Sequence, residues 1–253
     1  MTKSLFIGST VIRLSRVAST NNYARELVRD KMPIEGTVIV ADEQTEGRGQ
    51  RSNTWVTEPK KNLTCSYILK PVFLAAKDQF MLSAAVALAV FETISEFLPQ
   101  NDVKIKWPND LLVDGKKIAG ILIENSLRGN SLETSIVGIG LNINQVEFPK
   151  ELNATSLRSM DDTELEIDEV LNVLNSHLEK HYLRLRQGDL PSILSSLNQN
   201  LFGFEEQRTL RINGNEEVVA ILGARPSGEL QLQHADGSNT LHQYHEIEWN
   251  LKP

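Results

Sequence analysis

Short apolar runs recur along the first half of the chain, and their spacing predicts β-strands. Several of these runs alternate apolar and polar positions or are rich in β-branched residues, and turn-forming residues separate them. Asp114-Gly115 predicts a tight hairpin turn between two of the strands. The predicted strands cover residues 11–14, 37–41, 63–69, 103–106, 111–113, 117–124 and 132–139.

Apolar residues at helical spacing predict helices between and after these strands. The stretch 78–98 carries Phe80, Ala84 and Phe91 along one side, and we expect it to be the main core helix. A mixture of strands and helices of this kind predicts an α+β fold built on a mixed sheet. Further helices are expected after the polar segment 19–22, whose side chains can cap a helix, and at residues 167–186 and 190–201.

The pattern changes from Glu206 onward. Short predicted strands alternate there with Asn213-Gly214, Pro226-Ser227-Gly228 and Asp236-Gly237 turns, which is typical of a small antiparallel barrel. We therefore divide the chain into a larger domain, residues 1–204, and a smaller one, residues 205–253.

Composition narrows the class of protein. The chain has 253 residues, of which 40% are hydrophobic, so it can bury a substantial core. A net charge of -7 argues against nucleic acid as a partner, because phosphate backbones attract clustered lysine and arginine. The longest apolar run, residues 84–91, is too short to span a bilayer, and no secretory signal is evident, so we expect a cytoplasmic protein without a membrane partner. The single cysteine, Cys65, sits in a predicted strand and is interpreted as a core residue.

The segment 42–57 is a long polar loop that contains glycines and two arginines. Glycines let the backbone approach an anion closely, and arginine binds phosphate or carboxylate through two hydrogen bonds. The run Glu46-Gly47-Arg48-Gly49-Gln50-Arg51 therefore suits a phosphate or carboxylate, although a solvated flexible loop would have a similar composition. It lacks the Gly-Lys-Ser/Thr ending of the nucleotide-hydrolase phosphate loop.

Two further segments place chemically useful side chains beside strands. Lys106-Trp107-Pro108-Asn109-Asp110 joins a cation, an amide and a carboxylate at a rigid turn, and Lys117 follows shortly before Gly120. Each residue alone has a plain structural explanation, such as core packing for Trp107 or an exposed hairpin charge for Lys117. The run 138–144 alternates small and apolar residues in a strand, as the floor of a pocket requires.

Taken together, these segments resemble the biotin protein ligase family in their order, spacing and strand context. The resemblance covers nearly the whole chain. It rests on Ser19-Thr20-Asn21, Gln44-Thr45-Glu46-Gly47-Arg48-Gly49, Trp55, Lys106-Trp107-Pro108-Asn109-Asp110, Lys117-Ile118-Ala119-Gly120 and Gly138-Ile139-Gly140-Leu141-Asn142. It implies a mixed-sheet catalytic domain of the class II synthetase-like, biotin/lipoate ligase type, followed by an SH3-like barrel.

The resemblance also implies an activity and a set of site residues. Members of the family activate biotin with ATP, to which Mg2+ is bound, and form biotinyl-5'-AMP. They then transfer biotin to a lysine of a biotin carboxyl carrier protein. Catalytic residues are expected to be Arg48, Lys117 and Asp110. Biotin is expected to contact Ser19, Thr20, Asn21, Gln44, Gly47, Arg48, Gly49, Lys117, Gly120, Gly138 and Gly140. ATP is expected to contact Arg51, Asn53, Trp55, Lys106, Asn109, Asp110 and Asn142.

The chain departs from a common version of the family loop, in which Gly-Arg-Gly is followed by Arg-Arg-Gly-Arg. Gln50 replaces the first of these arginines, and we expect Arg51 to hold the adenylate in its place. Asp110 is a candidate to steer or deprotonate the incoming lysine, which is nucleophilic only when neutral.

Other interpretations stay open. Lipoate ligases and octanoyl transferases resemble this family in fold, and a non-catalytic biotin- or nucleotide-binding module would share the pocket. The Ser19-Thr20-Asn21 motif lies close to the first residue, so we expect no DNA-binding winged helix and no DNA partner. A homodimer formed through sheet edges is possible for this family.

Overall fold

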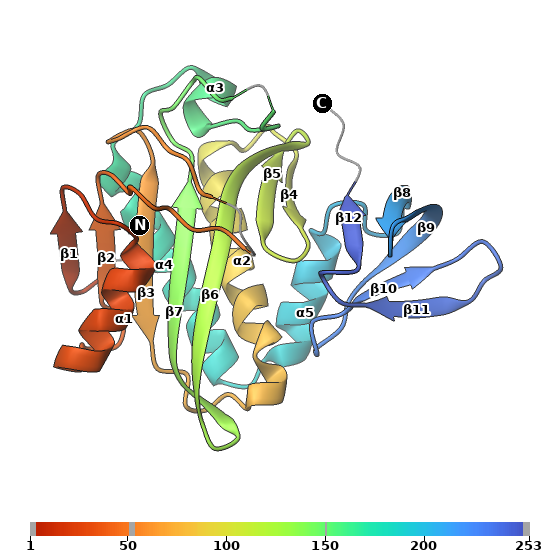
Figure 1. The fold of residues 1–253 in the computed structure, drawn as a ribbon, viewed down its shortest axis with the longest axis horizontal. Coiled ribbons are helices and arrows are strands. Elements are labelled where there is room, and N and C mark those ends of the chain that lie inside the picture. The colour runs from red at the N-terminus through yellow and green to blue at the C-terminus, as the bar shows by residue number, and fades with distance from the viewer. Residues whose placement is uncertain (1–3, 51–53, 150, 250–253) are drawn as a thin grey trace.

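The computed structural model describes residues 4–50, 54–149 and 151–249. Within these residues the larger sheet has the strand order β1-β2-β3-β7-β6-β5-β4 (Figure 1). β1 and β2 are parallel, and every other neighbouring pair is antiparallel, which confirms the predicted mixed sheet. The strands are β1 (Val11–Leu14), β2 (Val38–Ala41), β3 (Leu63–Leu69), β4 (Val103–Lys106), β5 (Asp110–Val113), β6 (Lys116–Arg128) and β7 (Ser131–Leu141).

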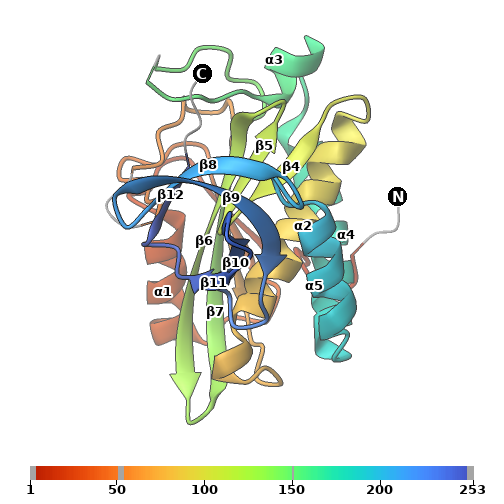
Figure 2. The ribbon, with the colours of Figure 1, turned by 90° about the vertical axis from the view of Figure 1, so that its right-hand side faces the viewer.

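Helices cover both faces of this sheet. Figure 2 shows α1 on one face and α2, α4 and α5 on the other. A small cluster that includes Ala24, Ile39 and Ile68 joins α1 to the sheet, and the main hydrophobic core lies on the opposite face. The helices are α1 (Thr20–Lys31), the short 3-10 turn η1 (Ala76–Asp78), α2 (Phe80–Phe97), α3 (Leu157–Asp161), α4 (Ile167–Arg186) and α5 (Leu190–Gln199).

The core helix α2 is apolar on nearly all sides, because it packs between the sheet, α4 and α5. The stretch Ala76–Phe97 is long and apolar enough to cross a membrane by length and composition, which corrects the expectation that no such segment occurs. Of its most apolar window, 61% is buried inside the protein. The helix is apolar because most of it is buried in the core.

A second, antiparallel sheet follows α5, with the strand order β11-β10-β9-β8-β12. It has the SH3-like barrel type expected for this part of the chain, and it lies at one end of the larger sheet (Figure 1). A hydrogen bond of 3.0 Å from Trp107 Nε1 to the Gly228 carbonyl joins the two parts. The domain boundary at residue 204 stays a prediction. The strands are β8 (Gln207–Ile212), β9 (Asn215–Ala224), β10 (Leu230–Gln233), β11 (Asn239–His242) and β12 (Ile247–Trp249).

Candidate active site

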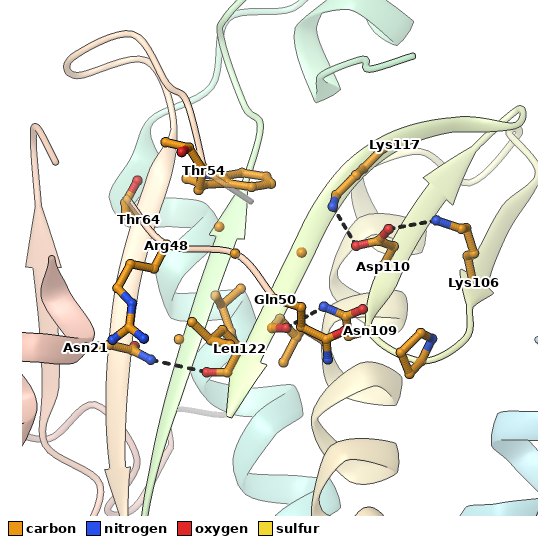
Figure 3. Close-up of a pocket in the computed structure, with 18 of the residues that line it drawn as sticks. Asn21, Arg48, Gln50, Thr54, Thr64, Lys106, Asn109, Asp110, Lys117 and Leu122 are labelled. Atoms are coloured by element: carbon orange, nitrogen blue, oxygen red, sulfur yellow. Dashed lines mark hydrogen bonds and ion pairs between the residues drawn. The ribbon is translucent and has the colours of Figure 1, made fainter. Parts of the chain in front are cut away.

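A cavity of about 260 Å³ opens on the surface of β6 and β7. It lies between the N-terminal end of α1, the polar loop that follows β2, the β4–β5 turn and the second sheet. Figure 3 shows labelled side chains from α1, from the polar loop and from the β4–β5 turn facing it. The predicted site residues that line it are Ser19, Thr20, Asn21, Gln44, Arg48, Gly49, Trp55, Lys106, Asn109, Asp110, Lys117, Gly120, Gly138 and Gly140.

Glycines form part of the cavity floor, and side chains would not fit at two of them. A Cβ atom on Gly138 would lie 2.4 Å from Asn21 Oδ1, and one on Gly140 would lie 2.3 Å from Trp55 Cε2. Gly140 pairs with Gly120 across β6 and β7, so two glycines meet at one point of the sheet. Glycine at these positions therefore lets the Asn21 and Trp55 side chains lie directly on the sheet.

One end of the cavity is built from uncharged hydrogen-bonding groups. The Thr20 backbone N–H and hydroxyl both donate to Gln44 Oε1, at 2.8 and 3.0 Å. The Ser66 hydroxyl lies 2.7 Å from Thr20 Oγ1 and 2.6 Å from Asn21 Oδ1. Ser19 occupies the N-cap position of α1, but its side chain makes no capping hydrogen bond, contrary to the expected capping role. These contacts fix Thr20, Asn21 and Gln44 beside the glycine floor.

Glu124 connects this uncharged end to the polar loop. Asn21 Nδ2 donates to Glu124 Oε2 at 3.0 Å, and Arg48 Nη1 lies 3.4 Å from Glu124 Oε1. Arg25 also pairs with this carboxylate, and Arg48 donates to Asn22 Oδ1 at 3.1 Å. Glu124 is not among the site residues predicted from the sequence, because its contacts depend on segments far apart in the chain.

The other end of the cavity is charged. Asp110 Oδ1 lies 2.6 Å from Lys117 Nζ, and Asp110 Oδ2 lies 2.9 Å from Lys106 Nζ (Figure 3). Lys106 and Asp110 face each other across the β4–β5 hairpin, whose turn contains the cis Trp107-Pro108 peptide bond. Burial disfavours the charged form of Asp110, but the positive charges of Lys117 and Lys106 outweigh it and hold the pKa of this carboxyl below its usual value.

The sequence led us to expect that Arg48 and Lys117 converge on one spot, where the biotin carboxylate meets the nucleotide. Both residues line the cavity, and their convergence on one spot stays a prediction. Figure 3 shows Arg48 beside Asn21 and Lys117 beside Asp110, so each cation has its own carboxylate partner. The structure thus brings both cations to one cavity and holds them at its different ends.

Two predicted residues lie away from the cavity lining. Gly47 packs against the loop itself, where an added Cβ would lie 2.3 Å from the Trp55 carbonyl oxygen. Asn142 is buried and donates from Nδ2 to the Thr155 carbonyl at 2.9 Å, so its side chain anchors the segment before α3. Arg51 and Asn53 lie outside the described residues, and their roles stay predictions.

Other residues of the cavity were not predicted. Tyr244, Ile247 and Trp249 come from the second sheet, and nothing local in their sequence distinguishes them from ordinary core residues. Cys65 also lines the floor, and burial raises the pKa of its thiol to about 12, in keeping with its interpretation as a core residue. Within the described ranges no group of three or more His, Cys, Asp or Glu residues is arranged to hold a metal ion.

Comparison with known proteins agrees with this geometry. Bifunctional ligase/repressor BirA from Bacillus subtilis (strain 168) is 38% identical over 186 residues, which cover 71% of this chain and 56% of that protein. Biotin--[acetyl-CoA-carboxylase] ligase from Mycobacterium tuberculosis is 25% identical over 210 residues, covering 82% and 77%. The chain thus spans little more than half the length of BirA.

Solved structures give the same result. A biotin protein ligase from Aquifex aeolicus in complex with biotin and ATP has a TM-score of 0.77 and 25% identity, covering 95% of this chain and 98% of that one. The Leishmania major biotin protein ligase in complex with biotinyl-5-AMP has a TM-score of 0.65 and 25% identity, covering 93% and 99%. The family model for the biotin/lipoate A/B protein ligase family matches residues 14–142, just over half of the chain. The chain therefore belongs to the biotin/lipoate A/B protein ligase family.

Proposed function

We propose that this chain is a biotin protein ligase, which activates biotin with ATP and transfers it to a lysine of a biotin carboxyl carrier protein. The observation that carries the proposal is one glycine-floored cavity, in which neutral hydrogen-bonding side chains gather at one end beside the Arg48–Glu124 ion pair and two lysines gather at the other end. A urea ring needs matched neutral donors and acceptors, whereas a carboxylate and a phosphate brought together need positive charge. Relatives of the chain are named biotin--[acetyl-CoA-carboxylase] ligases.

In the first half-reaction, an oxygen of the biotin carboxylate attacks the α-phosphorus of ATP. A new phosphorus–oxygen bond forms, the bond to the β-phosphate breaks, and pyrophosphate leaves with the electron pair. Both reactants are anionic, so cations reduce their repulsion and stabilise the charge on the reacting phosphorus. Lys117 and Lys106 at one end and Arg48 at the other are the described side chains of the cavity that supply this positive charge.

Magnesium is proposed to arrive bound to the phosphates of ATP. The Asp110 carboxylate already lies between two lysine ammonium groups, so it is not arranged as part of a metal-binding cluster. Bound to ATP, the ion would neutralise phosphate charge.

In the second half-reaction, the neutral amine of the carrier lysine attacks the acyl carbon of biotinyl-5'-AMP. An amide bond forms, the carbon–oxygen bond to phosphate breaks, AMP leaves with the electron pair, and the nitrogen loses a proton. A carboxylate whose pKa lies below the usual value is a weak base, so Asp110 is better suited to steering the lysine than to removing its proton.

The test is a biotin-dependent assay of pyrophosphate release, followed by mass spectrometry of an acetyl-CoA carboxylase carrier domain incubated with the enzyme. We expect turnover with biotin and one biotinyl group on the carrier, and no modification of a carrier whose acceptor lysine is replaced by arginine. Turnover with lipoate or octanoate alone would assign the chain to the sibling enzymes of the family. Binding of biotin without pyrophosphate release would identify a binding module.

Three further properties go with this proposal. We propose a cytoplasmic location for the protein. We propose no DNA partner, in line with the net charge of -7. A homodimer would form through an edge of the larger sheet, where β1 and β4 are the outer strands, and sedimentation of the purified chain tests this.

A further inference from the structure

Glu124 lies on β6, beside the neutral end of the glycine-floored reaction cavity. It is not among the residues that line this cavity, and 26% of its side chain is exposed. Its carboxylate contacts Asn21 and Arg25 of α1 and Arg48 of the polar loop. Any effect of Glu124 on a bound substrate therefore passes through these side chains.

The two carboxylate oxygens of Glu124 have different partners. Oε1 accepts a hydrogen bond from Arg25 Nη2 and lies 3.4 Å from Arg48 Nη1. Oε2 accepts a hydrogen bond from Asn21 Nδ2 at 3.0 Å. Because guanidinium groups pair strongly with a carboxylate, the two arginines hold Oε1 and leave Oε2 facing the Asn21 amide.

The contact with Oε2 selects one orientation of the Asn21 amide. Asn21 Nδ2 donates to Glu124 Oε2 and, at 3.4 Å, to the Leu122 carbonyl (Figure 3). Asn21 Oδ1 lies 2.6 Å from the Ser66 hydroxyl, which can donate or accept and so fits either orientation. A carboxylate only accepts, so Glu124 turns the amide nitrogen toward β6 and the amide oxygen toward the cavity floor at Gly138.

This orientation decides what the site offers to a ligand. Asn21 is 4% exposed and lines the cavity, and its Oδ1 has a second lone pair besides the one that faces Ser66. A ring N–H of a ureido group can donate to that lone pair. With the amide reversed, its NH2 group would face the ring N–H, and two donors would be left unpaired in a buried site.

We propose that Glu124 is a positioning residue for biotin, which raises the affinity by fixing the orientation of the Asn21 amide. Arg25 and Arg48 contribute by holding the carboxylate in place. The inference rests on the proposed ligase function, and it adds a residue outside the cavity to the recognition of the ureido ring.

Glu124→Gln is the first variant that tests this proposal. Glutamine matches glutamate in shape and the position is partly exposed, so we expect the variant to fold. The two arginines attract the single amide oxygen of the new side chain, so its amide nitrogen faces Asn21 and reverses the Asn21 amide. The dissociation constant for biotin, measured by calorimetry without ATP, should rise at least about tenfold.

Glu124→Met should weaken biotin binding less, by about threefold, because a thioether is only a weak acceptor and leaves the Asn21 amide free to take either orientation. This order distinguishes positioning from a structural role. If Glu124 only tied β6 to α1, methionine would be the more harmful replacement, since it loses every hydrogen bond. KM for ATP in pyrophosphate exchange should stay within about twofold of wild type in both variants.

A reciprocal exchange gives a second test. Asn21→Asp alone places two carboxylates face to face and should weaken biotin binding. Combined with Glu124→Gln, it restores one donor opposite one acceptor, so the double variant should bind biotin more tightly than either single variant. Glu133→Gln, at an exposed position of β7, is the matched control and should bind biotin as wild type does.

Several results would overturn the proposal. An equal or larger defect in Glu124→Met, or biotin binding within about twofold of wild type in Glu124→Gln, would show that the amide orientation does not set the affinity. So would a double variant that binds no more tightly than Glu124→Gln, and an equal rise in KM for ATP would indicate general loosening. Failure of the ligase function is a separate result: biotin binding without pyrophosphate release would remove that function, and the order of the dissociation constants would still decide this inference.

Discussion

The two ends of the glycine-floored cavity differ in the chemical groups that line them. At the end formed by α1 and β3, the Thr20, Asn21, Gln44 and Ser66 side chains form a chain of neutral hydrogen bonds. At the end formed by β4, β5 and β6, one carboxylate, that of Asp110, lies between two ammonium groups. The neutral end, where the charge of Arg48 is paired with Glu124, fixes shape and hydrogen-bond pattern, and the lysine-rich charged end fixes electrostatic potential. Under the proposed ligase function, this contrast predicts that affinity for biotin and rate of biotin activation can be altered separately.

The strongest test of this contrast is Lys117→Ala. The substitution removes a fixed positive charge where the acid and the phosphate are proposed to meet, so biotin-dependent pyrophosphate exchange should fall roughly 100- to 1000-fold. KM for biotin should change much less. Lys116→Ala, at the exposed neighbouring position, is the matched control and should keep nearly full activity. If Lys117→Ala raised KM for biotin and left kcat unaltered, the charged end would instead have a binding role.

Asp110→Asn tests the charged end through stability. It removes both ion pairs and leaves two ammonium groups close together, so the free energy of unfolding at pH 7 should fall by about 2 kcal/mol. Because the pKa of Asp110 is lowered in the folded protein, its contribution is complete above about pH 4 and is lost as the pH falls through the lowered pKa. Urea denaturation between about pH 3 and 7 should show the wild-type and variant curves converging at the acidic end. A difference that widens from pH 7 to pH 5 would contradict this.

Gly138→Ala tests the neutral end through shape. The new methyl group would lie 2.4 Å from Asn21 Oδ1, so Asn21 must move, and KM for biotin should rise about tenfold. KM for ATP should change by less than about threefold. Gly120→Ala is a milder substitution for comparison. Its Cβ would lie 3.3 Å from Trp55 Cζ3, so we expect this substitution to be tolerated better than Gly138→Ala. Equal effects of both substitutions on the two substrates would remove the distinction between the ends.

The smallest effect is expected for Ser66→Ala. Ser66 is fully buried behind Thr20 and Asn21, and loss of its one hydroxyl should raise KM for biotin about threefold. The rise should be the same at pH 6 and pH 8, because the group does not titrate. Ser135→Ala is the control: this buried hydroxyl on β7 has no hydrogen-bond partner among the described residues. A similar rise in the control would mean that packing, not hydrogen bonding, sets the affinity.

The sequence predicted most elements because their signals are local. Residues 63–69, 103–106 and 167–186 coincide with β3, β4 and α4, since each combines a clear apolar period with flanking turn or helix-start residues. The short helix α3 was missed, because five residues are too few to show a helical period. β6 was predicted to end at residue 124 but continues to Arg128; this extension is paired only with β7, and residues 126–128 are exposed.

The site was predictable to the extent that its residues lie in compact motifs. Fourteen predicted residues meet at the cavity, since the motifs end strands or fill the loop at one side of the sheet. Ser66, Glu124 and Tyr244 were missed because their positions depend on strand pairing and on docking of the second sheet. Asn142 lies in a motif, yet its side chain bonds to Thr155, a contact that no local pattern encodes.

The hydrogen bond from Trp107 to the Gly228 carbonyl predicts the effect of truncating the protein before the second sheet. Deleting the chain after α5 would take away the acceptor of a buried indole and the aromatic wall that Tyr244 and Trp249 give the reaction cavity. In such a truncated chain the cavity would be open on that side, and we expect the proposed ligase activity to be lost.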